Sequence, residues 1–180
     1  MKSLSILSRA ATGWRLIVQG HPGWRSQFAL TTPGLVTALL LYAFVAFLAV
    51  ALTSMSIGMP GIGGVIAAMA VLALPILAFV LVLLGTRKML NDTLPLLPAL
   101  VPGVYALTAL LLAEGLLALF AGPLVMLAWV GVAYLLYCLM RVAMGWHAAI
   151  SAGSAVLTFV LLVALRMALY MVSNFAASLV

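Results

Sequence analysis

Five long apolar runs dominate this sequence of 180 residues and decide what it can fold into. Hydrophobic residues make up 68% of the chain and charged residues only 6%. A water-soluble domain is nearer half apolar and a quarter charged, so this chain has too much apolar surface for a soluble core. We therefore predict an all-α, polytopic membrane protein in which lipid surrounds most segments.

Each apolar run is long enough for a transmembrane helix, which needs roughly 20 residues to cross a bilayer core of about 30 Å. Only Gly122-Pro123 separates the third run from the fourth, so we expect these two to form a tight antiparallel hairpin. Pro75 lies in the middle of the second run, where we expect it to kink the helix. The predicted spans are Gly34 to Thr53, Gly63 to Leu84, Leu97 to Ala121, Pro123 to Met140 and Ala149 to Val172.

The positions of the basic residues predict the orientation of these spans. They occur before the first span, between the second and third, and between the fourth and fifth, whereas the other connections and the tail after Val172 carry no charge. Because positively charged loops stay in the cytoplasm, we expect a protein of the cell inner membrane with its N-terminus in the cytoplasm and its C-terminus outside. These basic residues are Lys2, Arg9, Arg15, Arg25, Arg87, Lys88 and Arg141.

Residues 1–28 form a basic leader before residues 29–180, which we expect to be a single five-helix domain. Apolar residues recur in the leader at spacings of three and four, which predicts an amphipathic helix on the cytoplasmic membrane surface. A poorly ordered basic tail is the alternative. His21-Pro22-Gly23 predicts a turn, and we expect Trp24 after it to anchor in the lipid headgroups. The predicted apolar face consists of Leu4, Leu7, Ala11, Trp14 and Val18.

Glu114 and Arg166 are the two charged residues that lie deep within the predicted spans. A charge near the membrane centre is costly and normally pairs inside the protein. The third and fifth spans run in the same direction, and each residue lies about two-thirds of the way along its span, so we expect them at the same depth. We predict an ion pair, which a bidentate arrangement would satisfy. A pair that fixes helix register, a ligand or ion site, and a proton path are the alternatives.

The fifth span also carries a stripe of polar residues at spacings of three and four. This stripe should face the bundle interior or a water-filled cavity. We therefore take Glu114, Arg166, Thr158, Tyr170 and Ser154 as the candidate intramembrane polar site. The stripe consists of Ser151, Ser154, Thr158, Leu162, Arg166, Tyr170 and Ser173.

The sequence lacks the residue groups that catalysis usually needs. Its two acidic residues, Asp92 and Glu114, lie at different predicted depths, which excludes a carboxylate pair or a multi-carboxylate metal site. His21 and His147 have no metal-binding spacing, and Ser151-Ala152-Gly153-Ser154 lacks the strand–turn–helix context of a hydrolase. The net charge of +6 is scattered over segment ends. We predict no enzymatic activity, no cofactor, no metal and no nucleic-acid partner.

Three segments resemble bacterial members of the Yip-domain family of membrane proteins: Gly13-Trp14-Arg15, the stretch from Trp24 to Gly34, and Arg141-Val142-Ala143-Met144-Gly145. The predicted architecture is similar too, with a basic, partly helical leader and five spans joined by short loops. The resemblance implies a five-helix bundle without catalysis that acts through lipid or protein contacts. The aspartate- and tyrosine-containing signatures of the eukaryotic relatives are absent from the sequence, so it does not imply association with small GTPases.

Two functions from different classes fit these observations. The first is a non-catalytic interaction or scaffold protein, or an accessory subunit of a larger membrane assembly, which the small residues of the spans and the short loops favour. The second is a small transporter or substrate-binding membrane component with a site around Glu114 and Arg166, for which Pro75 and Pro102 would supply helix breaks. The expected partners are membrane lipids and other membrane protein subunits, and a homo-oligomer is an open alternative.

Overall fold

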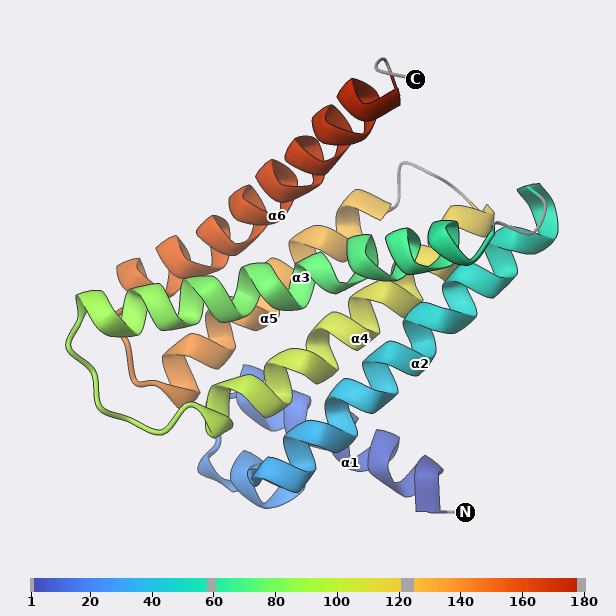
Figure 1. Ribbon diagram of the computed structural model, residues 1–180. Helices are drawn as coiled ribbons and strands as arrows, with labels where there is room; N and C mark the ends of the chain where they lie inside the picture. The colour runs from blue at the N-terminus through green and yellow to red at the C-terminus, as the bar shows by residue number, and fades with distance from the viewer. Residues whose placement is uncertain (1, 58–60, 121–124, 178–180) are drawn as a thin grey trace.

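The described chain is helical, and it contains no strand (Figure 1). A computed structural model describes the backbone of residues 2–57, 61–120 and 125–177, and the side chains of residues 8–54, 61–117 and 125–171. The all-α prediction is thus confirmed. The elements are α1 (Lys2–Val18), the 3-10 helix η1 (Pro22–Gln27), α2 (Thr32–Ile57), α3 (Ile62–Met89), α4 (Leu97–Phe120), α5 (Val125–Ala143) and α6 (Ala148–Ala177).

The helices α2 to α6 are all long and apolar enough to cross a membrane, which confirms the five predicted spans and makes this a multi-pass membrane protein. Several helices extend beyond the apolar runs that predicted them. The helix α3 continues to Met89 and ends with Arg87 and Lys88 in its last turn. Basic side chains are favourable there because they complement the negative end of the helix dipole.

The helix α4 forms the centre of the bundle. Half of the residues in its most apolar membrane-spanning stretch are buried, compared with 28% for each of the other four spans. It packs against α2 on one side and against α5 on the other, and α6 packs against α3 and α5 (Figure 1). The later part of α6 has fewer neighbours, and all residues from Met167 to Met171 are exposed.

The contact between α3 and α4 depends on a glycine. A Cβ atom on Gly103 would lie only 2.4 Å from Cζ of Phe79, whose side chain is completely buried. Near this contact, Pro75 interrupts the hydrogen bonding of α3 because it has no N–H. The hydroxyl of Tyr42 on α2 donates a hydrogen bond of 2.5 Å to the carbonyl oxygen of Leu72, one turn before the proline. Despite the proline, α3 is a continuous helix.

The leader is helical, as predicted, but it buries a different face. The helix α1 packs against η1, α4 and α5, so the bundle covers part of it. Ala11 and Val18, which we expected on the apolar face, are exposed, and Trp14 is half-buried. The side chains of the other two predicted face residues, Leu4 and Leu7, lie outside the described residues. The buried face instead contains Ala10, Gly13 and Ile17.

A close approach at Gly13 explains this shift in the buried face. A Cβ atom on Gly13 would lie 2.4 Å from Cε2 of Phe28, so only glycine lets the phenylalanine ring reach the helix. The predicted turn before Trp24 is present, with the His21 ring nitrogen Nδ1 accepting a 3.1 Å hydrogen bond from the Gly23 N–H. Trp24, however, is only 1% exposed. It is therefore packed within the protein, and our expectation of a headgroup anchor was wrong.

The leader and two connections meet at one end of the bundle, which we call the basic end. The connections between α3 and α4 and between α5 and α6 lie there (Figure 1). Arg25 of η1, Leu94 of the first connection and Met144 of the second line one cavity. The indole N–H of Trp146 donates a 2.8 Å hydrogen bond to Asp92, which joins the two connections directly.

Candidate functional site

Glu114 of α4 accepts a hydrogen bond from Trp129 of α5. The indole Nε1–H of Trp129 donates to Oε1 of Glu114, and both side chains are half-buried. Glu114 lies eight residues before Gly122 and Trp129 seven residues after it. In an antiparallel helical hairpin, residues equally far from the turn lie at equal depth, because each helix rises by about 1.5 Å per residue. The α4–α5 hairpin therefore places these two side chains side by side.

Arg166 of α6 lies over the face of the same tryptophan. Its guanidinium carbon, Cζ, is 5.2 Å from the centroid of the Trp129 ring, which is a cation–π distance. Phe159 of α6 also packs on this ring, with 5.6 Å between the ring centroids. Trp129 thus contacts the carboxylate through its N–H edge and the guanidinium through its face.

The predicted direct ion pair between Glu114 and Arg166 is wrong. No nitrogen of Arg166 lies within 4.0 Å of a carboxylate oxygen of any described residue. The helix α5 packs against both α4 and α6, and its Trp129 is interposed between the two charges. The Nε atom of Arg166 is buried and has no hydrogen-bond partner among the described residues. We refer to Glu114, Trp129 and Arg166 below as the charge–indole cluster.

The first part of the polar stripe on α6 faces the bundle, as predicted. Ser151, Ser154 and Thr158 are buried, but each hydroxyl is hydrogen-bonded to a nearby backbone carbonyl. Ser154 donates to the Ser151 oxygen at 3.0 Å, and Thr158 donates to the Ser154 oxygen at 2.8 Å. Such local bonds satisfy a hydroxyl without a partner from another helix. These side chains therefore support helix packing and do not extend the charge–indole cluster.

Beyond Arg166, the next residue of the stripe is Tyr170, which lies on the outside of the bundle. Tyr170 is 64% exposed, so it faces away from the bundle interior. The side chain of Ser173 lies outside the described residues. Of the five predicted site residues, the structure brings together Glu114 and Arg166, and it does so through Trp129, which the sequence analysis did not include. The nearly equal spacing of Glu114 and Trp129 around Gly122, eight residues before it and seven after it, was the signal available for finding it.

A second carboxylate–indole contact lies at the basic end. The carboxylate of Asp92 accepts hydrogen bonds from the Leu94 N–H at 2.9 Å and from the Trp146 indole at 2.8 Å. The backbone bond from Leu94 and then the indole bond lower the pKa of Asp92, because both stabilise its charged form. Arg87 donates from Nε to the backbone oxygen of Asp92 at 2.9 Å. This arrangement fixes the two connections to each other.

The described side chains contain no group of three or more His, Cys, Asp or Glu residues that could hold a metal ion. Cys138 is a free thiol buried in α5. Comparison with protein-family models, curated proteins and solved structures finds no match for this chain. The functional interpretation therefore depends on the contacts described above.

Proposed function

We propose that this protein is a non-catalytic subunit or scaffold of a larger assembly in the cell inner membrane, and that its partner binds at Arg166. The single observation that carries this proposal is the incomplete coordination of that side chain. Arg166 is half-buried within a membrane span, it lies on the Trp129 ring, and its Nε has no hydrogen-bond partner among the residues whose side chains are described. A guanidinium has five N–H donors, and a buried donor without an acceptor is costly.

The surroundings of Arg166 support binding of a neighbouring transmembrane helix. Met167 and Leu169 are exposed next to it, so this part of α6 has apolar surface that the described residues do not cover. A carboxylate or carbonyl group on a partner helix would satisfy the arginine, and an apolar helix face would cover its neighbours. A second copy of this chain is one such partner if a helix other than α6 supplies the acceptor, since α6 itself contains no acidic residue.

The transporter alternative has less support from the geometry. The hydroxyls of Ser151, Ser154 and Thr158 already bond to the backbone, so they offer little polar lining to a substrate. Transporter sites often use interrupted helices with free backbone groups, whereas α3 and α4 continue through Pro75 and Pro102. An anionic substrate bound at Arg166 is still a distinct outcome of the experiment below.

The proposal includes the orientation and the family resemblance. The basic residues Arg25, Arg87 and Lys88 all lie at the basic end, which supports placing this end in the cytoplasm. Five spans and a helical leader are the architecture that the resemblance to Yip-domain proteins implies, and that resemblance likewise suggests function through lipid or protein contacts.

Site-specific photocrosslinking in intact membranes tests the proposed partner surface. A photoreactive residue at Met167 should crosslink to one defined membrane protein or to a second copy, and Arg166→Met should abolish that crosslink. The matched control position is Leu40 on α2, which is 66% exposed and apolar but far along the chain from Arg166. Thermal unfolding in detergent would show that Arg166→Met still folds.

Two results would contradict the proposal. Equal labelling of lipid alone from Met167 and Leu40 would mean that α6 has no protein partner. A small anion that co-purifies with the wild type and is lost in Arg166→Met, without any protein crosslink, would instead support the transporter alternative.

A further inference from the structure

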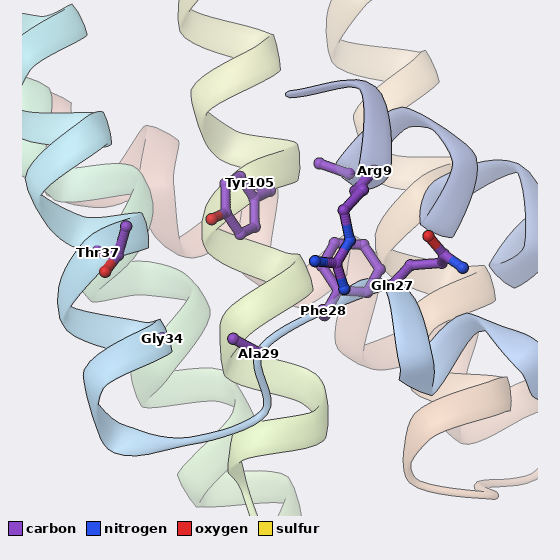
Figure 2. A pocket seen from close by; sticks show the side chains of 8 residues that line it. Arg9, Gln27, Phe28, Ala29, Gly34, Thr37 and Tyr105 are labelled. Carbon is purple, nitrogen blue, oxygen red and sulfur yellow. The ribbon is translucent and has the colours of Figure 1, made fainter. Parts of the chain in front are cut away.

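A cavity of about 230 Å³ lies where the leader meets the membrane-spanning helices (Figure 2). It is separate from the charge–indole cluster. Arg9 of α1, Thr37 near the start of α2 and Tyr105 of α4 contribute polar groups to its lining. Phe28 and Ala29, from the segment that joins η1 to α2, form an apolar wall. Three separate parts of the chain thus meet around one space.

Two polar groups of the cavity lining, Arg9 and Tyr105, have donors to spare, whereas the Thr37 hydroxyl donates to the Pro33 carbonyl oxygen at 2.9 Å and the Gln27 amide donates to Ser26. Arg9 donates from Nη2 to the backbone oxygen of Ser26 at 3.0 Å, which holds the guanidinium at the cavity and leaves its other N–H groups available. The hydroxyl of Tyr105 makes no hydrogen bond to any described residue. In Figure 2 the hydroxyl of Tyr105 points toward α2 and Thr37, and the Arg9 side chain extends from α1 toward Phe28.

No acidic side chain balances the charge of Arg9. The two acidic side chains of the sequence, Asp92 and Glu114, are not in the lining, and each accepts a hydrogen bond from a tryptophan. A cavity with one guanidinium, one free phenol O–H and no carboxylate favours an anion with several oxygen atoms. Phosphate fits this description best, because arginine binds two of its oxygens at once and a hydroxyl can donate to a third.

The apolar surface beside the cavity identifies the source of that phosphate. Leu40, Phe44 and Phe47 follow Thr37 along α2 at helical spacing, and all three are more than half exposed. They form an apolar track that runs from the cavity into the predicted membrane interior. A free phosphate ion would make no favourable contact with this apolar surface, whereas the acyl chain of a lipid would cover it.

We propose that this cavity binds the phosphate headgroup of an anionic membrane phospholipid, with an acyl chain along Leu40, Phe44 and Phe47. The bound lipid would join the leader to α2 and α4 at the membrane surface. This site does not depend on the proposed partner at Arg166, since the two share no residue.

Native mass spectrometry of the full-length protein in detergent tests this proposal. The probe is phosphatidylglycerol, with phosphatidylcholine and inorganic phosphate as separate arms. We expect one tightly bound phosphatidylglycerol, weaker binding of phosphatidylcholine, and no competition by inorganic phosphate at equal concentration. Arg9→Gln should weaken the binding of that lipid about tenfold, because it removes a charge-assisted hydrogen bond.

Two further variants control for charge and for folding. Arg15→Gln removes the same charge from an exposed position of α1 outside the cavity lining, and it should change binding less than twofold. Tyr105→Phe keeps the ring and its packing but removes the O–H, so it should weaken binding about threefold even if Arg9→Gln disturbs the leader.

The proposal would be overturned by any of three results. Equal losses in Arg9→Gln and Arg15→Gln would indicate nonspecific attraction to a basic surface. Unchanged binding in Tyr105→Phe would show that the lipid does not enter the cavity. Displacement of the lipid by inorganic phosphate at equal concentration would assign the site to a soluble anion.

Discussion

The indole N–H of Trp129 donates a hydrogen bond to Glu114, and the ring of the same tryptophan supports Arg166 on its face. Asp92 has a similar bond from Trp146, at 2.8 Å. Both acidic residues of this chain are therefore held by an indole. An indole N–H can satisfy a carboxylate without a second charge being removed from water. In a buried ion pair, the cost of removing both charges from water can exceed the attraction between them.

The charge–indole cluster predicts which pairs of substitutions are energetically coupled. Trp129→Phe removes the N–H donor but keeps a ring face for Arg166. Glu114→Leu with Trp129→Phe should therefore be less damaging than the sum of the single changes, by about 0.5–2 kcal/mol. Arg166→Met with Trp129→Phe should be close to additive, because phenylalanine retains much of the cation–π contact. Reversible unfolding in mixed detergent micelles measures each free energy.

A direct ion pair would give a different pattern of coupling. In the observed geometry, by contrast, Glu114→Leu and Arg166→Met should be coupled only while Trp129 is present. Their coupling energy should therefore disappear in a Trp129→Leu background. Strong coupling that persists without the tryptophan would show that the two charges interact directly, and the geometry described here would then be wrong.

The fold was largely predictable from the sequence, because the length of each apolar run fixes where a helix can cross the membrane. The packing of α4 against α5 was predictable from the short break between their apolar runs; the predicted turn at Gly122-Pro123 itself lies outside the described residues. The buried face of α1 was not, since it depends on the close approach of Phe28 to Gly13, which hydrophobic periodicity does not contain. Two of the three residues of the charge–indole cluster were found from their charge, but Trp129 was missed because we sought only an opposite charge for Glu114.

The lowered pKa of Asp92 predicts an acid-sensitive contribution to stability. In the unfolded chain this carboxyl binds a proton near its ordinary pKa of about 3.9. In the folded protein the Leu94 N–H and the Trp146 indole favour the charged form, so the folded state binds the proton less tightly. The contribution is therefore fully present above the ordinary pKa and is lost as pH falls through the lowered one.

Thermal unfolding between pH 7 and pH 3 tests this contribution. We expect the difference in Tm between the wild type and Asp92→Asn to be constant down to about pH 5 and to shrink below about pH 4. Asparagine keeps one oxygen that accepts one of the two hydrogen bonds, but its amide nitrogen cannot accept the other, so the variant loses one bond at every pH and only the pH dependence of the difference reports on the Asp92 charge. A difference in Tm that stays constant from pH 7 to pH 3 would mean that these hydrogen bonds do not stabilise the charged form of Asp92.

Gly103 and Gly115 form a matched pair of substitutions on α4. Gly103→Ala should destabilise the protein by about 1–3 kcal/mol, because the new methyl group overlaps the buried ring of Phe79. Gly115→Ala has no atom within 4 Å and should be neutral or stabilising by up to about 1 kcal/mol through helix propensity. Phe79→Leu should recover part of the loss in Gly103→Ala. Equal effects of the two alanines would contradict the close packing of α3 on α4.

The proposed orientation can be tested with single cysteines in a Cys138→Ala background, which removes the one native thiol. Gly61→Cys lies between α2 and α3, and Lys88→Cys lies at the basic end near the end of α3; both positions are exposed. Since basic loops stay in the cytoplasm, a membrane-impermeant maleimide added to intact cells should label Gly61→Cys and miss Lys88→Cys. Permeabilised cells should show labelling of both, which controls for thiol reactivity. The reverse pattern in intact cells would place the N-terminus outside. In that case the cavity at Arg9 would face the outer leaflet, and the proposed lipid would have to come from there.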